Sequence, residues 1–233
     1  MKLGIIGAMK VEIESLRDSM ASLEITERAG MVFYQGLLEN LPVVVVECGV
    51  GKVNAAMCVQ ALCDCFDVTH ILNTGVAGSL SAALDIGDLV ISQDAMYHDF
   101  DCSALAYPIG QVPGLAVKKF SADEMLKTAA FNAAQIVHKD HVHIGTVASG
   151  DQFVSQKSTK EKIISDTNAL CTEMEGAAIA HAAWRNDKPF VIIRAISDKA
   201  DDSAQMDYPT FEAAAAKHCA AVTKTVAAKM ANM

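Results

Sequence analysis

The sequence predicts an α/β fold, in the form of a single-domain three-layer α/β/α sandwich with a central mixed, twisted sheet. Short runs rich in Val, Ile and Leu alternate with longer helical patterns along the chain, and this alternation is typical of α/β architectures. Several runs are almost continuously apolar, as expected of strands that are covered on both faces. A length of 233 residues suits one domain with a substantial core.

The individual elements follow from these patterns. Strands are expected at 2–6, 32–37, 42–47, 70–74, 88–92, 143–149 and 190–196, and helices at 11–20, 52–66, 122–137, 158–165, 175–186 and 209–230. Glu12 follows the first apolar run almost at once, which indicates a buried strand rather than a signal peptide. Only residues 38–41 separate the second and third strands, so these two should form a hairpin. Asn186 to Pro189 is a helix stop before the last strand.

One long segment, 97–120, has little periodicity and contains Pro108, Gly110, Pro113 and Gly114. Connections of this length in compact domains are usually functional or form contacts. The chain contains no interdomain linker, low-complexity segment or internal repeat, so residues 1–233 are expected to form one domain.

The composition excludes several classes of protein. The chain is 52% hydrophobic and 20% charged, with a formal charge of −9. Such a charge argues against a nucleic-acid-binding surface and against adhesion to anionic lipid. No run approaches ~20 uninterrupted apolar residues, so no membrane span is expected. The seven cysteines are odd in number and lack a Cys-x-x-Cys pair, which predicts reduced thiols and a cytoplasmic location.

Three carboxylates, Glu12, Glu175 and Asp198, lie where predicted strands give way to helices. In open α/β sheets, ligands bind outside the carboxyl ends of the strands, so these acids could converge on one site. No basic cluster accompanies them. The combination indicates acid–base chemistry on an uncharged or cationic centre rather than capture of a phosphate.

Each acid also has an ordinary structural explanation. Glu12 could be a solvated carboxylate near a helix N-terminus, and Glu175 and Asp198 could cap the segments that follow them. A carboxylate among apolar residues is costly without compensating hydrogen bonds or a ligand, which favours a pocket wall formed by Glu173 and Glu175. Arg194, inside a predicted strand, needs a carboxylate partner, and Glu12 or Glu175 would serve.

The glycine-rich segments do not match nucleotide-binding motifs. The turn at Gly4 to Gly7 lacks the G-x-G-x-x-G spacing, and the segment that ends at Lys52 lacks the Walker pattern. In Asn73 to Ser79, two glycines are three positions apart, which fits either a turn approached by a ligand or a tight strand-to-helix connection. We therefore expect no nicotinamide or flavin cofactor.

The histidines provide weaker indications. His138, His141 and His143 are close in sequence, but they straddle a helix-to-strand connection and include Lys139 among them, so no metal site is expected. His98 and Asp99 fit either a pair beside a ligand or an ordinary turn.

Seven segments in order resemble the methylthioadenosine/S-adenosylhomocysteine nucleosidases, within the nucleoside phosphorylase-like superfamily. They are Gly4-Ile-Ile-Gly-Ala-Met9 with Glu12, Gly49-Val-Gly-Lys-Val53, Asn73-Thr-Gly-Val-Ala-Gly78, Tyr97-His-Asp99, Ser149-Gly-Asp-Gln-Phe153, Glu173-Met-Glu175 and Arg194-Ala-Ile-Ser-Asp198. The resemblance runs nearly end to end, and seven ordered motifs are far more specific than any one of them.

The resemblance implies a homodimer that hydrolyses the N-glycosidic bond of 5′-methylthioadenosine and S-adenosylhomocysteine, and also of 5′-deoxyadenosine, in purine and methionine salvage. It implies no cofactor and no metal. By this resemblance Asp198 would be the acid at the purine, Glu12 would activate water and Glu175 would bind the ribose hydroxyls.

The resemblance also implies a substrate-binding set. It comprises Met9, Val50, Val76, Ala77, Gly78, Phe153, Val154, Glu173, Met174, Arg194, Ser197 and Tyr208, with Cys102, Leu105 and Pro113 entering from the partner subunit. Phe153 would pack against adenine, main-chain groups of Val154 would read its edge, and Met174 would pack under the sugar. Val76 stands where some relatives have serine, and Tyr208 where phenylalanine is common.

Two other functions remain open from the residues. One is phosphate-dependent purine nucleoside phosphorolysis, which needs cations to hold phosphate; Glu12 would repel that anion. The other is non-catalytic nucleoside binding, because a fold does not determine a function. Methylthioadenosine, S-adenosylhomocysteine, 5′-deoxyadenosine and aminofutalosine share adenine and ribose, so the sequence predicts the substrate class rather than its preferred member.

Overall fold

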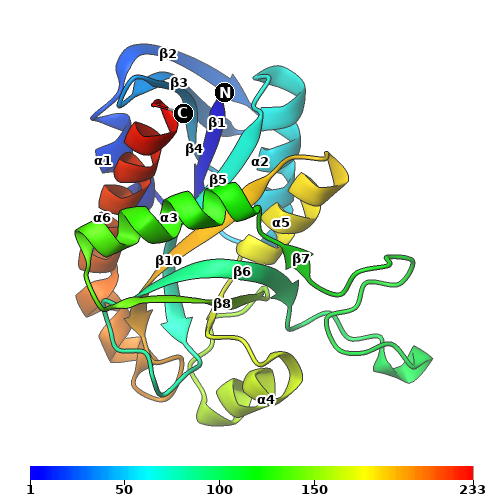
Figure 1. Ribbon diagram of the computed structural model, residues 1–233. Helices are drawn as coiled ribbons and strands as arrows, with labels where there is room; N and C mark the ends of the chain where they lie inside the picture. Colours follow the sequence, from blue (N-terminus) through cyan, green and yellow to red (C-terminus); the bar gives the residue numbers. More distant parts are fainter. Residues whose placement is uncertain (233) are drawn as a thin grey trace.

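The computed structural model describes residues 1–232 (Figure 1). The strands are β1 (Leu3–Gly7), β2 (Ala21–Arg28), β3 (Met31–Leu38), β4 (Leu41–Glu47), β5 (His70–Ser79), β6 (Leu89–Tyr97), β7 (Phe120–Ser121), β8 (Val142–Ser149), β9 (Cys171–Glu173) and β10 (Phe190–Asp198). The α-helices are α1 (Lys10–Arg17), α2 (Lys52–Cys65), α3 (Glu124–Val137), α4 (Lys157–Thr167), α5 (Gly176–Arg185) and α6 (Ala204–Met230), and a short 3₁₀ turn, η1 (Ser103–Leu105), lies in the long 97–120 segment.

The strands of the described chain form one mixed sheet of ten strands. Its centre is parallel, because β1 pairs with β4 and β5, and β5 pairs with β10. The expected hairpin is confirmed: β3 and β4 are antiparallel and joined at Leu38 and Leu41. The two turn residues, Glu39 and Asn40, have φ of 51° and 67°, which matches the left-handed backbone that two-residue hairpin loops require.

Helices cover both faces of the sheet (Figure 1). Buried residues of α2 and α5 share one apolar cluster with the strands, and those of α1, α3 and α6 share the other. The predicted three-layer α/β/α arrangement with a mixed sheet is therefore confirmed. None of the helices within residues 1–232 combines the length and the apolar character needed to cross a bilayer.

Part of the sheet closes on itself. β10 pairs with both β5 and β6, and the short strand β9 pairs with both β5 and β8, so that β5, β10, β6, β8 and β9 form a ring. At one end of this ring Gly78 of β5 lies between Asp198 and Thr172. The closure thus brings the ends of three strands together at the place where a site was expected.

The structure corrects the prediction for 73–79, which is not a turn. β5 continues through this segment to Ser79, because its backbone pairs with β10 along its length and with β9 at its end. The glycines of the segment are therefore strand residues.

Helix boundaries also differ from the prediction, and three strands, β2, β7 and β9, were not predicted. α6 begins at Ala204 rather than at Pro209, so the proline lies within the helix near its start. α1 ends at Arg17, and the chain continues into β2, an edge strand that was not predicted. Nearly all residues of β2 are exposed, so it has no buried face and no apolar alternation by which it could be recognised.

Candidate active site

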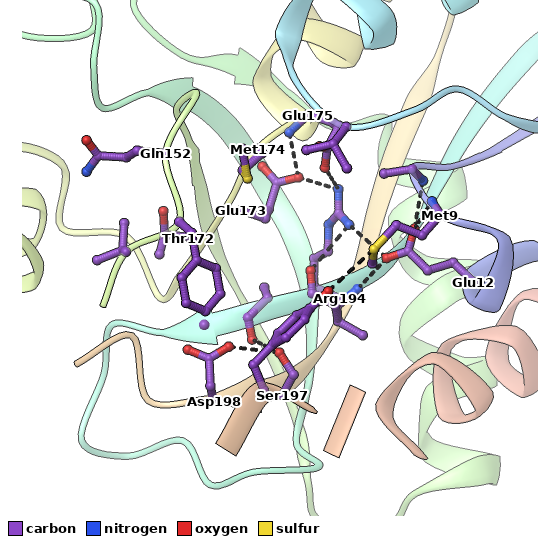
Figure 2. Close-up of a pocket in the computed structure, with 18 residues that line it drawn as sticks. Met9, Glu12, Gln152, Thr172, Glu173, Met174, Glu175, Arg194, Ser197 and Asp198 are labelled. Atoms are coloured by element: carbon purple, nitrogen blue, oxygen red, sulfur yellow. Dashed lines mark hydrogen bonds and ion pairs between the residues drawn. The ribbon is translucent and has the colours of Figure 1, made fainter. Parts of the chain in front are cut away.

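A cavity of about 580 Å³, counting its mouth, lies at the carboxyl ends of β1, β5, β9 and β10. This position is the one expected for ligands in open α/β sheets. Figure 2 shows its side chains. The lining contains every catalytic and substrate-binding residue expected from the sequence, namely Met9, Glu12, Val50, Val76, Ala77, Gly78, Phe153, Val154, Glu173, Met174, Glu175, Arg194, Ser197, Asp198 and Tyr208.

Three further lining residues were not predicted: Ala8, Gln152 and Thr172. Ala8 and Gln152 are next to predicted residues and could have been inferred from that adjacency. Thr172 lies on the three-residue strand β9, which is too short for a periodic pattern. Its hydroxyl oxygen is buried and has no hydrogen-bond partner within the described chain, so it is free to interact with a bound ligand.

Arg194 is the centre of a buried charge cluster. Its guanidinium forms a short ion pair with Glu173 and a hydrogen bond of 2.6 Å with Asn73 Oδ1. Glu175 and Glu12 lie at 3.8 Å and 4.0 Å from its nitrogens. Burial lowers the pKa of Arg194, but the glutamates more than offset this and hold it above its ordinary value. One fixed positive charge thus faces three carboxylates.

The closest partner of Arg194 is Glu173, whereas the sequence argument named Glu12 or Glu175. Glu173 is positioned at the start of α5, where its carboxylate accepts hydrogen bonds from Glu175 N (3.1 Å) and Gly176 N (2.8 and 3.0 Å). The positive end of the helix stabilises an anion there. Glu173 therefore anchors both the arginine and the helix.

Glu12 is held by three backbone N–H groups. Its Oε2 accepts from Ala8 N (2.6 Å) and Met9 N (3.0 Å), and its Oε1 accepts from Val76 N (3.0 Å). Burial raises the pKa of Glu12, while Arg194 and the three N–H donors oppose that rise by stabilising the anion. The ordinary alternative of a solvated carboxylate is wrong, because Glu12 is 1% exposed.

Glu175 lies directly before α5 and is also buried. Its Oε1 accepts a hydrogen bond of 2.9 Å from Gly51 N, at the start of α2. Burial and the neighbouring Glu173 raise the pKa of Glu175, and Arg194 opposes them. Its side chain is therefore a proton-sensitive acceptor that lines the cavity.

Asp198 stands apart from the glutamate cluster, on the other side of the cavity (Figure 2). Its Oδ1 accepts from Ala200 N at 2.8 Å, and its Oδ2 accepts from the Ser197 hydroxyl at 2.9 Å. Burial raises the pKa of Asp198 against these two hydrogen bonds. Burial thus biases all three acids towards the protonated form, but only for Glu12 and Glu175 does the positive charge of Arg194 oppose that bias.

Gly75 and Gly78 let these side chains approach the β5 backbone. A Cβ at Gly75 would collide with the Arg194 guanidinium and the Glu12 carboxylate, and one at Gly78 would lie 2.8 Å from Asp198 Oδ1. The two glycines therefore make room for the acids of the site itself.

The remaining wall is apolar with a few polar groups. The rings of Phe153 and Tyr208 meet edge to face at 5.4 Å. The Tyr208 hydroxyl donates a hydrogen bond to Glu212 Oε1 at 2.8 Å and lies 3.4 Å from Met9 Sδ. The hydroxyl of Tyr208 therefore already has a hydrogen-bond acceptor within the protein. Val154 is buried, and its N–H and C=O form no hydrogen bond with other groups of residues 1–232.

No cation of the described lining is free to hold a phosphate. Arg194 is the only basic residue that lines the cavity within residues 1–232, and it is bonded to Glu173. Lys52 is outside the lining and pairs with Asp99 at 2.6 Å and Asp151 at 3.6 Å. Asp99 thus forms an ion pair with Lys52 and does not line the cavity.

Cys102, Leu105 and Pro113 do not line the cavity of their own chain. They belong to the segment between β6 and β7, which extends away from the rest of the molecule (Figure 1). Leu105 is 70% exposed, and Phe153 and Val50 at the cavity are each 48% exposed. Apolar groups are therefore uncovered both on the projecting segment and at the mouth of the cavity.

Known proteins resemble this chain over nearly its whole length. The family model described as the phosphorylase superfamily matches residues 2–228. The 5′-methylthioadenosine/S-adenosylhomocysteine nucleosidase of Geobacillus kaustophilus is 42% identical over 221 residues, covering 94% of each chain.

Solved structures agree with that match. The corresponding nucleosidase of Neisseria meningitidis, in complex with methylthio-immucillin-A, superimposes with a TM-score of 0.95 at 35% identity and covers 98% of this chain and 99% of its own. The enzyme of Colwellia psychrerythraea, in complex with adenine, has a TM-score of 0.94 at 35% identity and covers 97% and 94%.

Proposed function

This chain belongs to the phosphorylase superfamily, among its 5′-methylthioadenosine/S-adenosylhomocysteine nucleosidases, and on that basis we propose how its buried acids divide the reaction. The enzyme hydrolyses the N-glycosidic bond of 5′-methylthioadenosine and S-adenosylhomocysteine to adenine and a 5-thioribose product, in purine and methionine salvage. We extend the substrate range to 5′-deoxyadenosine, which shares the adenine and ribose. One observation carries the division of roles: Asp198 is separate from the glutamates around Arg194.

Asp198 acts as the general acid at the leaving base. Cleavage of a nucleoside C–N bond leaves negative charge on adenine, as a glycoside leaving group also does. Because burial raises the pKa of Asp198, the carboxyl can hold a proton and donate it to nitrogen 7 of adenine. Its other oxygen can accept from the exocyclic amine, which favours 6-amino over 6-oxo purines.

Glu12 acts as the general base on water. The three backbone N–H groups and Arg194 stabilise its anionic form against the burial that raises its pKa, and proton abstraction uses that anionic form. Glu175, with one oxygen held by Gly51 N, binds the ribose hydroxyls, and its negative charge favours the oxocarbenium-like sugar. Phe153 packs against adenine and the main-chain groups of Val154 hydrogen bond its edge.

Substitution of the base tests its role. Glu12→Gln is expected to lower kcat by ~10²–10⁴-fold, the usual contribution of general-base catalysis. It should also lower the melting temperature, because both oxygens of Glu12 accept backbone N–H groups and an amide NH₂ would oppose one of them. Stopped assays of adenine release and thermal unfolding would measure the two effects.

Glu14→Gln is the matched control, because Glu14 lies on the same helix and is half-exposed, and its ion pairs among residues 1–232 are to Lys10 and Arg17. It should leave kcat and stability unchanged. Hydrolysis by Glu12→Gln at the unaltered rate would exclude Glu12 as the base.

The choice of water over phosphate has its own experiment. Adenine release from methylthioadenosine should proceed at full rate in phosphate-free buffer, with methylthioribose as the sugar product. The reason is that Arg194, the only basic lining residue within the described chain, is bonded to Glu173. A reaction that required phosphate and produced a sugar 1-phosphate would show phosphorolysis, and binding without turnover would show a nucleoside-binding protein.

We also propose that the enzyme is a cytoplasmic homodimer in which residues 1–233 form one nucleosidase domain. The exposed Leu105 on the projecting segment, together with the exposed Val50 and Phe153, supports a partner subunit whose Cys102, Leu105 and Pro113 cover the cavity. All seven cysteines lie in the described chain and none forms a disulfide, which supports a reducing compartment.

A further inference from the structure

Three histidines between the end of α3 and the start of β8 gather around one buried aspartate outside the nucleoside cavity. We propose that Asp88, His138 and His141 bind a divalent transition-metal ion of the Zn²⁺ type. The sequence alone argued against a metal, because His138, His141 and His143 straddle a helix-to-strand connection. The fold changes that argument, because it places Asp88, 50 positions before His138 in the chain, beside His138 and His141.

The geometry of the three side chains suits such an ion. Asp88 directly precedes β6, His138 follows the last residue of α3, and His141 directly precedes β8. One ligand atom from each lies within 4.8 Å of the other two, and His141 Nδ1 is 2.8 Å from Asp88 Oδ1. Ligand atoms around a tetrahedral zinc are roughly 3.3 Å apart. Movements of about 1–2 Å, within reach of side-chain rotation, would therefore complete the site.

The charge of the cluster also favours a cation. The Asp88 side chain is 5% exposed, and within residues 1–232 its only ion-pair partners are the two histidines His141 and His143. Its second oxygen accepts from Asp85 N at 2.9 Å and lies 3.2 Å from His143 Nε2. A buried carboxylate without a lysine or arginine is costly. The hydrogen bonds from Asp85 N and His143 to Asp88 Oδ2 leave Oδ1 to face the ion, and hydrogen bonds to the non-coordinating atoms of a metal ligand orient that ligand.

A fourth histidine provides a separate observation. The ring of His218, on α6, is 5.1 Å from the ring of His138. Its Nδ1 is buried and has no hydrogen-bond partner within the described chain, although such buried nitrogens are nearly always paired. A water molecule bound to a metal ion beside His138 would supply a hydrogen-bond partner for His218 Nδ1.

An ion here would join elements that also hold the catalytic residues. The backbone of Gly87 and Asp88 pairs with Ile196 of β10, at 2.8 and 2.9 Å, two residues before Asp198. His138 belongs to the end of α3, which packs against α6. We therefore assign the ion a structural role, in which it ties α3 and β8 to the strand that carries Asp198.

The experiment uses the full chain without a histidine tag, treated with a chelator and then dialysed. Isothermal titration with ZnCl₂ is expected to show one ion per chain with micromolar or tighter affinity. A saturating ion should raise the melting temperature by roughly 5 °C or more. Co²⁺ should produce the visible absorption of a nitrogen- and oxygen-ligated ion without a thiolate charge-transfer band.

Two substitutions locate the site. His141→Ala and Asp88→Asn should each weaken Zn²⁺ binding by at least tenfold and abolish the thermal shift. The His141 side chain is 55% exposed, so its removal should leave the fold intact even if Asp88→Asn does not fold. His70→Ala, which removes a partly buried histidine hydrogen bonded to Thr69, should bind Zn²⁺ like the unaltered chain.

Three outcomes would overturn the proposal. One is the absence of saturable binding by the unaltered chain. The second is equal affinity after His141→Ala. The third is a thiolate charge-transfer band with Co²⁺, because it would assign the ion to cysteines, of which Cys65 is exposed.

Discussion

Asp198→Asn is expected to retain nucleoside binding and to lose most of its turnover. A general acid contributes typically ~10²–10⁴-fold, so kcat for methylthioadenosine should fall by that factor. An asparagine can still donate an N–H to nitrogen 7 of adenine and accept from the exocyclic amine, but it cannot transfer a proton. The dissociation constant of adenine, measured by titration calorimetry, should therefore change less than tenfold.

The same substitution should not destabilise the protein. Asparagine preserves both local contacts, because its oxygen can accept from Ala200 N and its NH₂ can donate to the Ser197 hydroxyl. Burial raises the folded-state pKa of Asp198. A carboxyl with a raised folded-state pKa loses its stabilising contribution as pH rises through that value. At neutral pH the variant should thus melt at the same temperature as the unaltered enzyme or higher.

Asp202→Asn is the matched control, since Asp202 is exposed and four positions away. It should leave kcat unchanged. A kcat within tenfold of normal for Asp198→Asn would remove Asp198 from the role of acid.

Arg194→Met should have the largest effect on stability. The guanidinium is 1% exposed and is the shared counter-charge of Glu173, Glu175 and Glu12. Removing one partner of a buried ion pair costs about 3–5 kcal/mol. At about 2–4 °C per kcal/mol for a chain of this size, the melting temperature should fall by roughly 6–20 °C. Activity should be lost as well, because Glu12 would lose the positive charge that opposes the rise of its pKa and favours its anionic form.

The loss of stability should depend on pH. Burial already raises the pKa of Glu12 and of Glu175, and Arg194 opposes both rises. Without the arginine, their folded-state pKa values rise further above the unfolded value of about 4.3. Stability then falls as pH increases through the folded-state values. The deficit of Arg194→Met should therefore be larger at pH 8 than at pH 5, as thermal unfolding at both would show.

Two further variants test the electrostatic explanation. Glu173→Gln combined with Arg194→Met should recover part of the stability, because it removes the carboxylate closest to the missing charge. Arg185→Met, at the exposed end of α5, should melt like the unaltered protein. A melting temperature for Arg194→Met within 2 °C of normal would contradict the role assigned to the cluster.

The three acids could be found from the sequence because each lies where one local sequence pattern gives way to another. Glu12 and Asp198 follow apolar strands closely, and Glu175 starts a helix of small residues. The partner of Arg194 could not be found in this way. Glu173 and Glu175 are both near the arginine in space, and only the helix geometry that brings Glu175 N and Gly176 N to Glu173 decides which carboxylate forms the short ion pair.

The sequence by itself determined the α/β class, the hairpin of β3 and β4, and the acids of the site, because these depend on neighbours within a few residues. Only the tertiary structure decided that β9 closes the strand ring, that Thr172 lines the cavity, and that Asp88 meets His138 and His141. Each of these depends on pairing between segments far apart in the chain. No local pattern records such pairing, because its free energy comes from the packing of the whole fold.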